Sequence, residues 1–240
     1  MHDAHATPHA PLLSARGLTK TYGPTTALGG VDLDVRRGEA VAIMGASGSG
    51  KTTLLHVLAG IVTPDAGTVT LQARSGARLV NDLREAERSR LRREELGFVF
   101  QQGLLLPELT ALENAALPLL LAGHPRAAAE AHAAQWLAAL GLSGLEDRRI
   151  GQLSGGQAQR VAIARAQVTG ARVVFADEPT GALDSATSAE VMTALLDATL
   201  RQGHALVVVT HDADVAARCT RTIRLRDGRV QAVPAHGASR

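Results

Sequence analysis

Alternation of hydrophobic and polar residues marks the first part of the chain as β-structure. Two alternating segments, at residues 12–22 and 27–35, are separated by a Gly-Pro pair and predict two strands. The largely apolar segment at residues 38–45 predicts a buried strand, and the apolar spacing between residues 51 and 60 is helical. The chain is therefore expected to run from a buried strand through a glycine-rich loop into a helix.

The middle of the chain changes to helical patterning. Strands are expected at residues 67–71 and 97–100, on either side of a charged helix near residues 83–95. Residues 104–166 are rich in Ala and Leu and predict helices, with breaks at Pro107, Pro118, Pro125, Gly141 and Gly151. An all-helical segment between two β-rich segments predicts an inserted helical subdomain.

The last third of the chain returns to β-structure. Strands are expected at residues 173–176, 205–210 and 222–225, with a helix near residues 186–202 between the first two. The pattern predicts an α/β core with a mainly parallel sheet, interrupted by a helical subdomain at about 104–166. Residues 1–11 and 231–240 are expected to be tails.

Composition narrows the class of protein. Of 240 residues, 45% are hydrophobic but only 2% are aromatic, which suits Ala, Val, Leu and Ile side chains packed on a buried parallel sheet. The single Cys219 predicts a reduced thiol, and the first residues lack the pattern of a signal peptide. No stretch of eighteen apolar residues occurs, so the chain itself is not expected to span a membrane.

Charge gives no indication of a nucleic-acid partner. The formal net charge is +2, and the basic residues between Arg84 and Arg93 are interleaved with glutamates, as on a solvated helix face. We therefore expect no nucleic-acid partner. His2, His5 and His9 lie in the polar N-terminal tail, and we interpret them as part of that tail rather than as a metal site.

The segment GASGSGKT fits the G-x-x-x-x-G-K-T phosphate-binding loop, in the strand, loop and helix setting that such a loop requires. Glycines let backbone N–H groups approach phosphate oxygens, and the helix that follows adds its positive end. Lys51 is expected on the β- and γ-phosphates of a nucleotide, Thr52 on Mg²⁺ and Thr53 on a phosphate nearer the ribose. The expected phosphate-binding residues are Gly45, Ala46, Ser47, Gly48, Ser49, Gly50, Lys51, Thr52 and Thr53.

An acidic pair follows the strand predicted at residues 173–176. Open α/β sheets bind ligands at the carboxyl ends of their strands, so Asp177 and Glu178 are expected beside the phosphate loop. Asp177 would hold Mg²⁺, directly or through water, and Glu178 would accept the proton of an attacking water. By themselves the loop and the acidic pair predict a P-loop NTPase core, which many functions share.

The sequence LSGGQ at residues 153–157 makes the prediction more specific. It follows the phosphate loop in the chain and precedes the acidic pair and the sequence VVVTHD. A chain with these four motifs in this order resembles the nucleotide-binding domain of ATP-binding cassette (ABC) proteins. The resemblance implies a head-to-tail pair of domains around two ATP and two Mg²⁺, with LSGGQ of one domain facing the γ-phosphate held by the other. Ser154 would offer its hydroxyl, Gly155 and Gly156 would leave the backbone bare, and Gln157 completes this anion site at a helix start.

The same resemblance implies roles for further residues. Gln101, at the end of GFVFQ, matches the glutamine loop that senses Mg²⁺ and the attacking water, although Gln102 beside it leaves a one-residue ambiguity. His211, after VVVT, matches the switch histidine that contacts the γ-phosphate. Asp184 matches a loop that touches the opposite subunit, and Tyr22 matches the ring that stacks on adenine.

The resemblance covers about residues 12–230 and implies one α/β nucleotide-binding domain there, with a P-loop NTPase core, a mainly parallel sheet and an antiparallel β subdomain. It also reaches a subgroup. Residues 104–123 resemble ATPases of macrolide exporters, lipoprotein release and cell-division complexes, whereas Ala158 and Ala182 depart from that subgroup. It implies a cytoplasmic ATPase, peripheral on the inner face of the cell membrane, that drives a separate integral-membrane permease. The alternative is an ATPase that works a membrane complex without transport. DNA-repair ATPases would need a long coiled coil, and cassette translation factors would need two cassettes; this sequence has neither.

Overall fold

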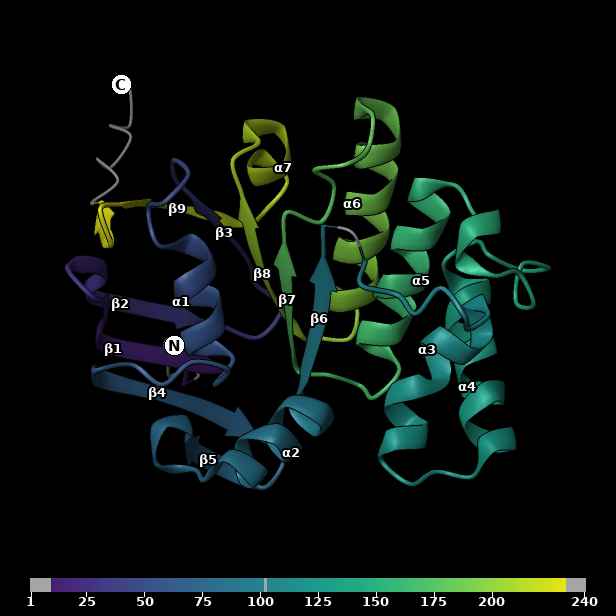
Figure 1. Cartoon of the computed structure of the whole chain (residues 1–240), viewed down its shortest axis with the longest axis horizontal. Coiled ribbons are helices and arrows are strands. Elements are labelled where there is room, and N and C mark those ends of the chain that lie inside the picture. The colour runs from purple at the N-terminus through teal and green to yellow at the C-terminus, as the bar shows by residue number, and fades with distance from the viewer. Residues whose placement is uncertain (1–9, 102, 232–240) are drawn as a thin grey trace, which may run out of the picture.

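Two β-sheets and the helices around them form the structure, which is a computed structural model (Figure 1). It describes residues 10–101 and 103–231. The predicted α/β fold, with a mainly parallel sheet, a separate antiparallel sheet and a helical lobe, is confirmed. Most of the two predicted tails, including His2, His5 and His9, lies outside the described residues.

The larger sheet has the strand order β10-β9-β3-β8-β7-β6, and its strands run parallel except for β10 at one edge. Along β7, Val173 and Phe175 belong to one hydrophobic core, and Val174 and Ala176 belong to the other. Both faces of the sheet are therefore buried, which explains its nearly continuous apolar strands. The strands are β3 (Ala40–Met44), β6 (Leu96–Phe100), β7 (Val173–Asp177), β8 (Ala205–Thr210), β9 (Arg221–Arg226) and β10 (Arg229–Gln231).

The smaller sheet is antiparallel, with the order β2-β1-β4-β5. The helix α1 (Lys51–Leu58) packs between the two sheets, because Leu54, Leu55 and Leu58 are buried in a core that both sheets share. The loop that opens α1 is therefore in reach of both sheets. The strands are β1 (Leu13–Tyr22), β2 (Thr25–Val35), β4 (Ala66–Ala73) and β5 (Gly76–Leu79).

A helical lobe lies on the right of Figure 1 and consists of α3 (Ala111–Leu121), α4 (Arg126–Ala139) and α5 (Gly155–Gln167). Its core is built largely of buried alanines, which allow the helices to approach closely. The helices α5 and α6 (Ser185–Leu200) contact each other and join the core on the second face of the larger sheet. Within the described residues, no helix is both long and apolar enough to cross a membrane.

The predicted break at Pro118 is wrong, because α3 continues through it to Leu121. A proline inside a helix removes one backbone hydrogen bond. Here the preceding turn is anchored in the core through Ala115 and Ala116, which are fully buried. The reversal of the chain follows at Gly123, whose φ of 86° lies in the left-handed region that glycine adopts readily.

Short elements account for the remaining differences from the predicted pattern. The charged helix is present as α2 (Glu85–Glu95), but the pattern does not predict β5, β10, α7 (Ala213–Ala217) or two 3₁₀ turns at Val80–Asp82 and Ile150–Gln152. These elements are three to five residues long and none is buried along its whole length, so they lack the apolar runs that mark the equally short strands β3 and β7. The helix α7 is instead set by its N-cap, where Asp212 accepts a hydrogen bond from the Asp214 N–H at 2.7 Å.

Candidate functional site

Loops that follow neighbouring parallel strands meet at one edge of the larger sheet. The register pairs Asp177 of β7 with Val209 of β8 on one side and with Phe100 of β6 on the other. Met44 of β3 pairs with Thr210 of β8. The phosphate loop, the acidic pair, the histidine after β8 and the glutamine after β6 therefore emerge side by side, at the edge where open α/β sheets bind ligands.

The phosphate loop connects β3 to α1 and is held by close backbone contacts on two sides. Gly50 has a φ of 99°, and a Cβ atom there would collide with the Ala27 carbonyl of β2. A Cβ atom at Gly45 would collide with the Leu225 carbonyl of β9. These glycines are therefore required by the packing of the loop between the two sheets, in addition to their part in phosphate approach.

Lys51 opens α1, and its Nζ donates to the Gly45 and Ala46 carbonyl oxygens at 2.8 and 2.9 Å. Its ammonium group is thus held against the loop that would receive the phosphates. Thr52 follows it and donates from Oγ1 to Asp177 Oδ2 at 3.4 Å. This bond joins the start of α1 to the end of β7.

The pair formed by Thr52 and Asp177 fits Mg²⁺, because the ion prefers oxygen ligands and commonly combines one or two carboxylates with substrate phosphates. Burial raises the pKa of Asp177, although the hydrogen bond from Thr52 opposes this effect. Across the described residues, no cluster of three or more His, Cys, Asp or Glu is arranged to hold a metal ion by itself. An ion held by Thr52 and Asp177 would complete its coordination with waters or with oxygens of a bound phosphate.

Glu178 is held at the end of β7 by several contacts. Its N–H donates to the Val209 carbonyl at 2.9 Å, and Thr210 Oγ1 donates to its Oε2 at 3.3 Å. Its Oε1 lies 2.8 Å from His211 Nδ1, and this hydrogen bond raises the pKa of His211. The backbone φ of Glu178 is 48°, in the left-handed region that few residues other than glycine adopt. A carboxylate fixed in this way can act as a general base toward water.

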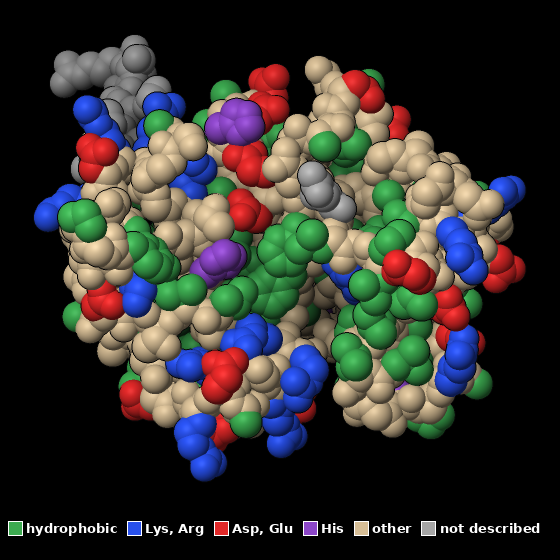
Figure 2. Space-filling view, viewed as in Figure 1, with side chains coloured by type: hydrophobic (Ala, Val, Ile, Leu, Met, Phe, Trp, Pro, Cys, Tyr) green, Lys and Arg blue, Asp and Glu red, His purple; other side chains and the backbone are tan. Residues whose placement is uncertain are grey.

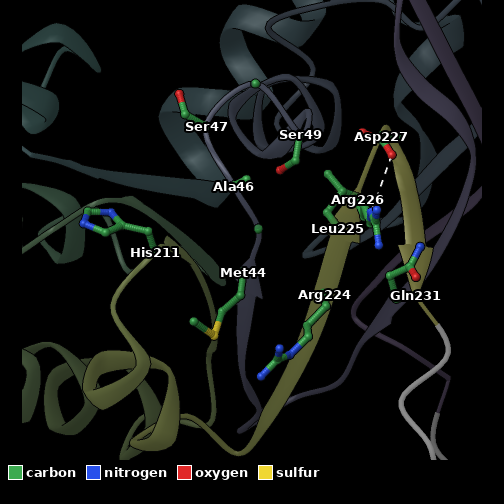
Figure 3. Close-up of a pocket in the computed structure, with 12 residues that line it drawn as sticks. Met44, Ala46, Ser47, Ser49, His211, Arg224, Leu225, Arg226, Asp227 and Gln231 are labelled. Carbon is green, nitrogen blue, oxygen red and sulfur yellow. Dashed lines mark ion pairs between the residues drawn. The ribbon is translucent and has the colours of Figure 1, made fainter.

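A cleft of about 660 Å³ brings much of the predicted site together. A second hollow, of about 730 Å³, lies against the first half of the phosphate loop and the end of β9, with Ser49, Arg224 and Arg226 around it (Figure 3). His211 lines both hollows. The residues that line the 660 Å³ cleft are Thr25, Ala27, Ser47, Gly48, Gly50, Lys51, Thr52, Thr53, Asp177, Glu178, Val209 and His211.

Gln101 directly follows β6 and is exposed. A Cβ atom at Gly181 would lie 2.9 Å from Gln101 Nε2, so the glutamine side chain packs against the loop that follows the acidic pair. The pairing of β6 with β7 places Gln101 near the cleft, but Gln101 does not line either hollow. Gln102, the alternative to Gln101, lies outside the described residues.

Tyr22 ends β1 and pairs with Thr25, which lines the cleft. Its ring is 50% exposed, so it offers a surface for stacking at the cleft's rim. The Lys20 ammonium lies 5.6 Å from the ring centroid and forms an ion pair with Asp65 at 2.9 Å. Hydrogen bonds from Lys20 and Thr21 lower the pKa of Asp65 to about 2. One side of the tyrosine ring is therefore occupied by an anchored cation.

The LSGGQ segment forms the N-terminus of α5. Ser154 and Gln157 form a capping box, in which Ser154 Oγ accepts from the Gln157 N–H at 3.3 Å and Gln157 Oε1 accepts from the Ser154 N–H at 2.9 Å. Gly155 is exposed, as expected, but Gly156 is buried, which corrects the expectation that both glycines leave the backbone bare. A Cβ atom at Gly156 would collide with the Thr187 side chain of α6.

Asp184 caps the N-terminus of α6, and Thr187 N–H and Thr187 Oγ1 donate to its carboxylate at 3.0 and 2.6 Å. These hydrogen bonds lower the pKa of Asp184. Its neighbour Leu183 packs near Gly155, where an added Cβ atom would lie 2.9 Å from the leucine side chain. The segment around Asp184 and the first turn of α5 are thus packed together within one chain.

The structure separates the predicted site residues into two groups. The phosphate loop, the acidic pair and His211 share the cleft, and Tyr22 and Gln101 lie beside it. The second group comprises Asp184 and the LSGGQ residues. All of them lie in the described part of the chain, and none lines either hollow. A nucleotide phosphate in the cleft would therefore meet only the first group within one chain.

Sequence reasoning missed two supporting contacts. Thr210, at the end of β8, donates a hydrogen bond to Glu178. Its position directly before His211 in VVVTHD could have indicated this contact. Asp65 holds the strand that carries Tyr22, from a position more than forty residues away. No local pattern marks that contact, because it depends on the pairing of β1 with β4.

Comparison with known proteins gives a consistent result. A family model described as ABC transporter matches residues 28–181. The chain is 47% identical over 227 residues to the pyoverdine export ATP-binding/permease protein PvdT of Pseudomonas syringae pv. tomato. It is 48% identical over 224 residues to the macrolide export ATP-binding/permease protein MacB of Rhodopseudomonas palustris. Each alignment covers 92% of this chain but 34% of the relative, so the chain spans about a third of the curated relatives it matches.

Solved structures agree with this result over nearly their full length. The chain is similar to the ATP-binding cassette MJ0796 in a dimeric post-hydrolysis state bound to ADP and Pi, with a TM-score of 0.81 and 40% identity. That alignment covers 91% of this chain and 96% of the other. The similarity to cbiO1 from Clostridium perfringens, part of the ABC transporter complex cbiONQ, has a TM-score of 0.81, 28% identity and coverage of 93% and 88%. These findings confirm the resemblance predicted from the motifs.

Proposed function

The chain belongs to the ABC transporter family and is an ATP-hydrolysing cassette of it, and on this premise we propose that two copies drive a separate membrane permease. The copies would pack head to tail around two ATP and two Mg²⁺. The observation that carries the proposal is the cluster of Thr52, Asp177, Glu178 and His211 beside the phosphate loop.

In the proposed reaction, Glu178 accepts the proton of a water that attacks the γ-phosphorus. The bond from the water oxygen to phosphorus forms as the bond from phosphorus to the ADP oxygen breaks, with the two oxygens in line. The contacts from Thr210 and His211 support this role of Glu178, because they fix the direction of its carboxylate. Lys51 and the backbone N–H groups of the loop stabilise the charge on the transferring phosphoryl group.

Thr52 and Asp177 are the proposed protein ligands of Mg²⁺, and Gln101 would approach the same place from the neighbouring strand. When bound, the ion neutralises charge on the β- and γ-phosphates. The oxygen ligands 3.4 Å apart support the first two assignments, and the pairing of β6 with β7 supports the third. Thr53, which also lines the cleft, would contact a phosphate nearer the ribose.

Adenine would stack on Tyr22 at the rim of the cleft. Stacking supplies affinity with little discrimination between bases. Lys20 lies over the tyrosine ring on one side, so the opposite face is the one proposed for adenine. The position of Thr25, which pairs with Tyr22 and lines the cleft, supports this placement.

The LSGGQ segment would act on the nucleotide of a second copy. Among the described residues, none of this segment lines the hollows around the phosphate loop, whereas Ser154 and Gly155 are exposed at a helix N-terminus. A helix N-terminus favours an anionic group such as a γ-phosphate. The dimeric state of the similar cassette MJ0796 supports the same arrangement, in which Asp184 would touch the opposite copy.

The permease is proposed to dock between α2 and the helical lobe. A groove of about 480 Å³ there is lined by apolar side chains, including Phe98 and Leu121, together with Arg92, Arg93 and Arg165. Figure 2 shows this hollow between arginine-rich and hydrophobic surfaces. An amphipathic cytoplasmic segment that carries an acidic residue fits this lining. The chain would then lie on the cytoplasmic face of the cell membrane, held there by its permease.

Export is the proposed direction of transport. The relatives PvdT and MacB are named as export ATP-binding/permease proteins, and they combine both parts in one chain. Purification of the tagged chain from detergent-solubilised membranes tests whether a permease accompanies it. Recovery of the chain without any membrane protein, at native expression levels, would contradict the permease proposal while leaving the ATPase proposal intact.

The decisive test of the catalytic proposal is Glu178→Gln. This variant keeps the size and shape of the side chain but replaces the carboxylate with a neutral amide, which removes the general base, so turnover should fall by roughly a hundredfold or more. ATP binding should remain, and the unhydrolysed nucleotide should hold two copies together. Turnover is measured by phosphate release, and the dimer by size-exclusion chromatography with ATP and Mg²⁺.

Glu130→Gln on α4 is a matched control, because Glu130 forms an ion pair with Arg126 away from the cleft. It should hydrolyse ATP at the rate of the unmodified chain and elute in the same way. Full turnover in Glu178→Gln would contradict the assignment of Glu178. A catalytically slow variant that stays monomeric with ATP would contradict the dimer.

A further inference from the structure

The loop that carries Gln101 is fastened to the helix α5 by side-chain donors on both sides of the glutamine. Before it, Gln159 Nε2 donates to the Phe100 carbonyl at 2.8 Å. After it, Arg165 Nη1 donates to the Leu104 carbonyl at 2.7 Å and Nη2 to the Gly103 carbonyl at 2.5 Å. The glutamine thus lies between two anchor points on one helix.

These anchors are buried or half-buried, which increases their effect. Gln159 is 4% exposed, so its hydrogen bond is shielded from water. Arg165 is half-buried, and burial lowers the pKa of its guanidinium below the ordinary value. A planar guanidinium that donates to two carbonyl oxygens fixes their relative position, which a single ammonium cannot do.

The anchored part of the loop has an unusual backbone conformation. Gly103 and Leu104 have φ values of 65° and 46°, and a leucine adopts this left-handed region at a cost. Both bonds of Arg165 are to the carbonyls of these two residues. The side chain therefore stabilises the strained part of the loop directly.

The helix α5, which supplies these hydrogen-bond donors, also contacts the LSGGQ segment, β6 and the groove proposed for the permease. It begins at Gly155 in the LSGGQ segment, and near its end Ala166 packs so closely on β6 that a Cβ atom at Gly97 would collide with the Ala166 carbonyl. Arg165 itself lines the groove proposed for the permease. One side chain therefore contacts both that groove and the loop after Gln101.

We propose that Arg165, assisted by Gln159, is a positioning residue that holds Gln101 toward the proposed metal and water site. It does so by fixing the loop around Gln101 to α5, the helix that begins in the LSGGQ segment. The proposal rests on the proposed role of Gln101 in hydrolysis. Arg165 lines neither of the hollows beside the phosphate loop. It acts on the reaction through the backbone of the loop.

Hydrogen exchange of the nucleotide-free full chain tests the anchor independently of activity. In Arg165→Lys the charge remains but one of the two carbonyl contacts is lost, so amides in a peptide spanning residues 97–105 should exchange about tenfold faster. Gln159→Met, which keeps side-chain length and removes the donor, should accelerate exchange of the same peptide. Arg160→Lys, on the same helix but paired with Glu190 at 3.7 Å, is the control and should leave this peptide unchanged.

Kinetics then separate positioning from a general loss of structure. Both test variants should bind ATP within about twofold of the unmodified chain, lose about tenfold in kcat and require more Mg²⁺ for half-maximal hydrolysis. Unchanged exchange at residues 97–105 in both variants would overturn the proposal, as would faster exchange with unchanged kcat and Mg²⁺ dependence. If the unmodified chain does not hydrolyse ATP, the proposed function fails, and the exchange result still decides whether the anchor exists.

Discussion

The phosphate side and the signature side of the proposed ATP site are built in different ways. On the phosphate side, groups from different strands and from α1 hydrogen-bond to one another: Thr52 to Asp177, and Thr210 and His211 to Glu178. On the signature side, polar side chains hydrogen-bond only within a helix cap, as Ser154 does with Gln157. Tertiary structure thus brings together the polar groups of the first side, whereas local structure orders the polar groups of the second.

This difference indicates which side can work alone. The parallel strands place the proposed catalytic groups around one cleft in a single chain, so the proposed phosphate contacts do not require a second copy. The signature groups are ordered but face no cleft formed by the described residues of their own chain. Binding of nucleotide is therefore expected of one copy, and hydrolysis of two.

Ser154→Arg should separate binding from hydrolysis with the largest effect. A bulky side chain at the exposed cap would keep the signature away from the γ-phosphate of the second copy, and hydrolysis should fall by about a thousandfold through loss of charge stabilisation. Binding of ATP to the monomer, measured by calorimetry at low protein concentration, should be nearly unchanged. Ser143→Arg, at another exposed serine of the lobe, serves as the control.

Loss of ATP binding by monomeric Ser154→Arg would show that the signature acts within its own chain. The distinction between the two sides would then be wrong. Retention of rapid hydrolysis would instead show that this cap lies away from the reacting phosphate.

Gly156→Ala tests how tightly the signature side is tied to its own chain. The added methyl group would collide with Thr187 of α6, and overpacking of this kind costs about 1–3 kcal/mol of unfolding free energy. Urea denaturation gives the difference. Gly151→Ala is the matched control, because a Cβ atom there meets nothing within 4 Å and the glycine has no left-handed φ.

Equal stability of Gly156→Ala and Gly151→Ala would mean that α6 yields to the added methyl group. The signature would then be less firmly held than the packing indicates. Hydrolysis by the two variants, compared at a temperature where both are folded, would show whether Gly156 also matters for phosphate approach.

The contact between His211 and Glu178 predicts a smaller effect that depends on pH. The hydrogen bond with Glu178 raises the pKa of His211, so hydrolysis should decline as the pH falls through this raised value, where a charged imidazole competes for the base. His211→Gln should remove this decline and reduce turnover at neutral pH by about tenfold. His124→Gln, at an exposed turn, should follow the unmodified profile.

The same contact should influence stability in the opposite direction. A histidine with a raised pKa in the folded state stabilises it fully below its ordinary pKa of about 6.5 and loses this contribution as the pH rises through the folded value. His211 is largely exposed, so screening by salt reduces the contribution. Urea denaturation of the unmodified chain and of His211→Gln on both sides of this range measures it, and an equal difference at both pH values would contradict the contact.

The sequence predicts the phosphate side well, because its parts are local motifs whose meeting follows from strand order. The buried strands before Gly45, Asp177 and His211 show continuous apolar runs, and parallel pairing brings their ends together. Contacts made across the fold are different. The collision that would follow a side chain at Gly156 depends on the approach of α6, and the anchor of Gln101 depends on α5, so no window of sequence contains either.

Local rules also failed where tertiary packing overrides them. Pro118 predicts a helix break, but the buried face of α3 holds the helix through it. Short elements such as α7 and β10 escape periodicity and take their form from a cap or from pairing with β9. The missing information in each case is which surfaces lie against one another.

The left-handed backbone of Glu178 shows that this chain is not optimised for stability alone. Glycine or asparagine would adopt a φ of 48° more readily, since an ordinary residue there costs about 1–2 kcal/mol. The chain nevertheless places a carboxylate at this point, where Thr210 and His211 hold it. The proposed role of Glu178 thus conflicts with a relaxed backbone, and a glycine at this position is expected to stabilise the fold at the expense of hydrolysis.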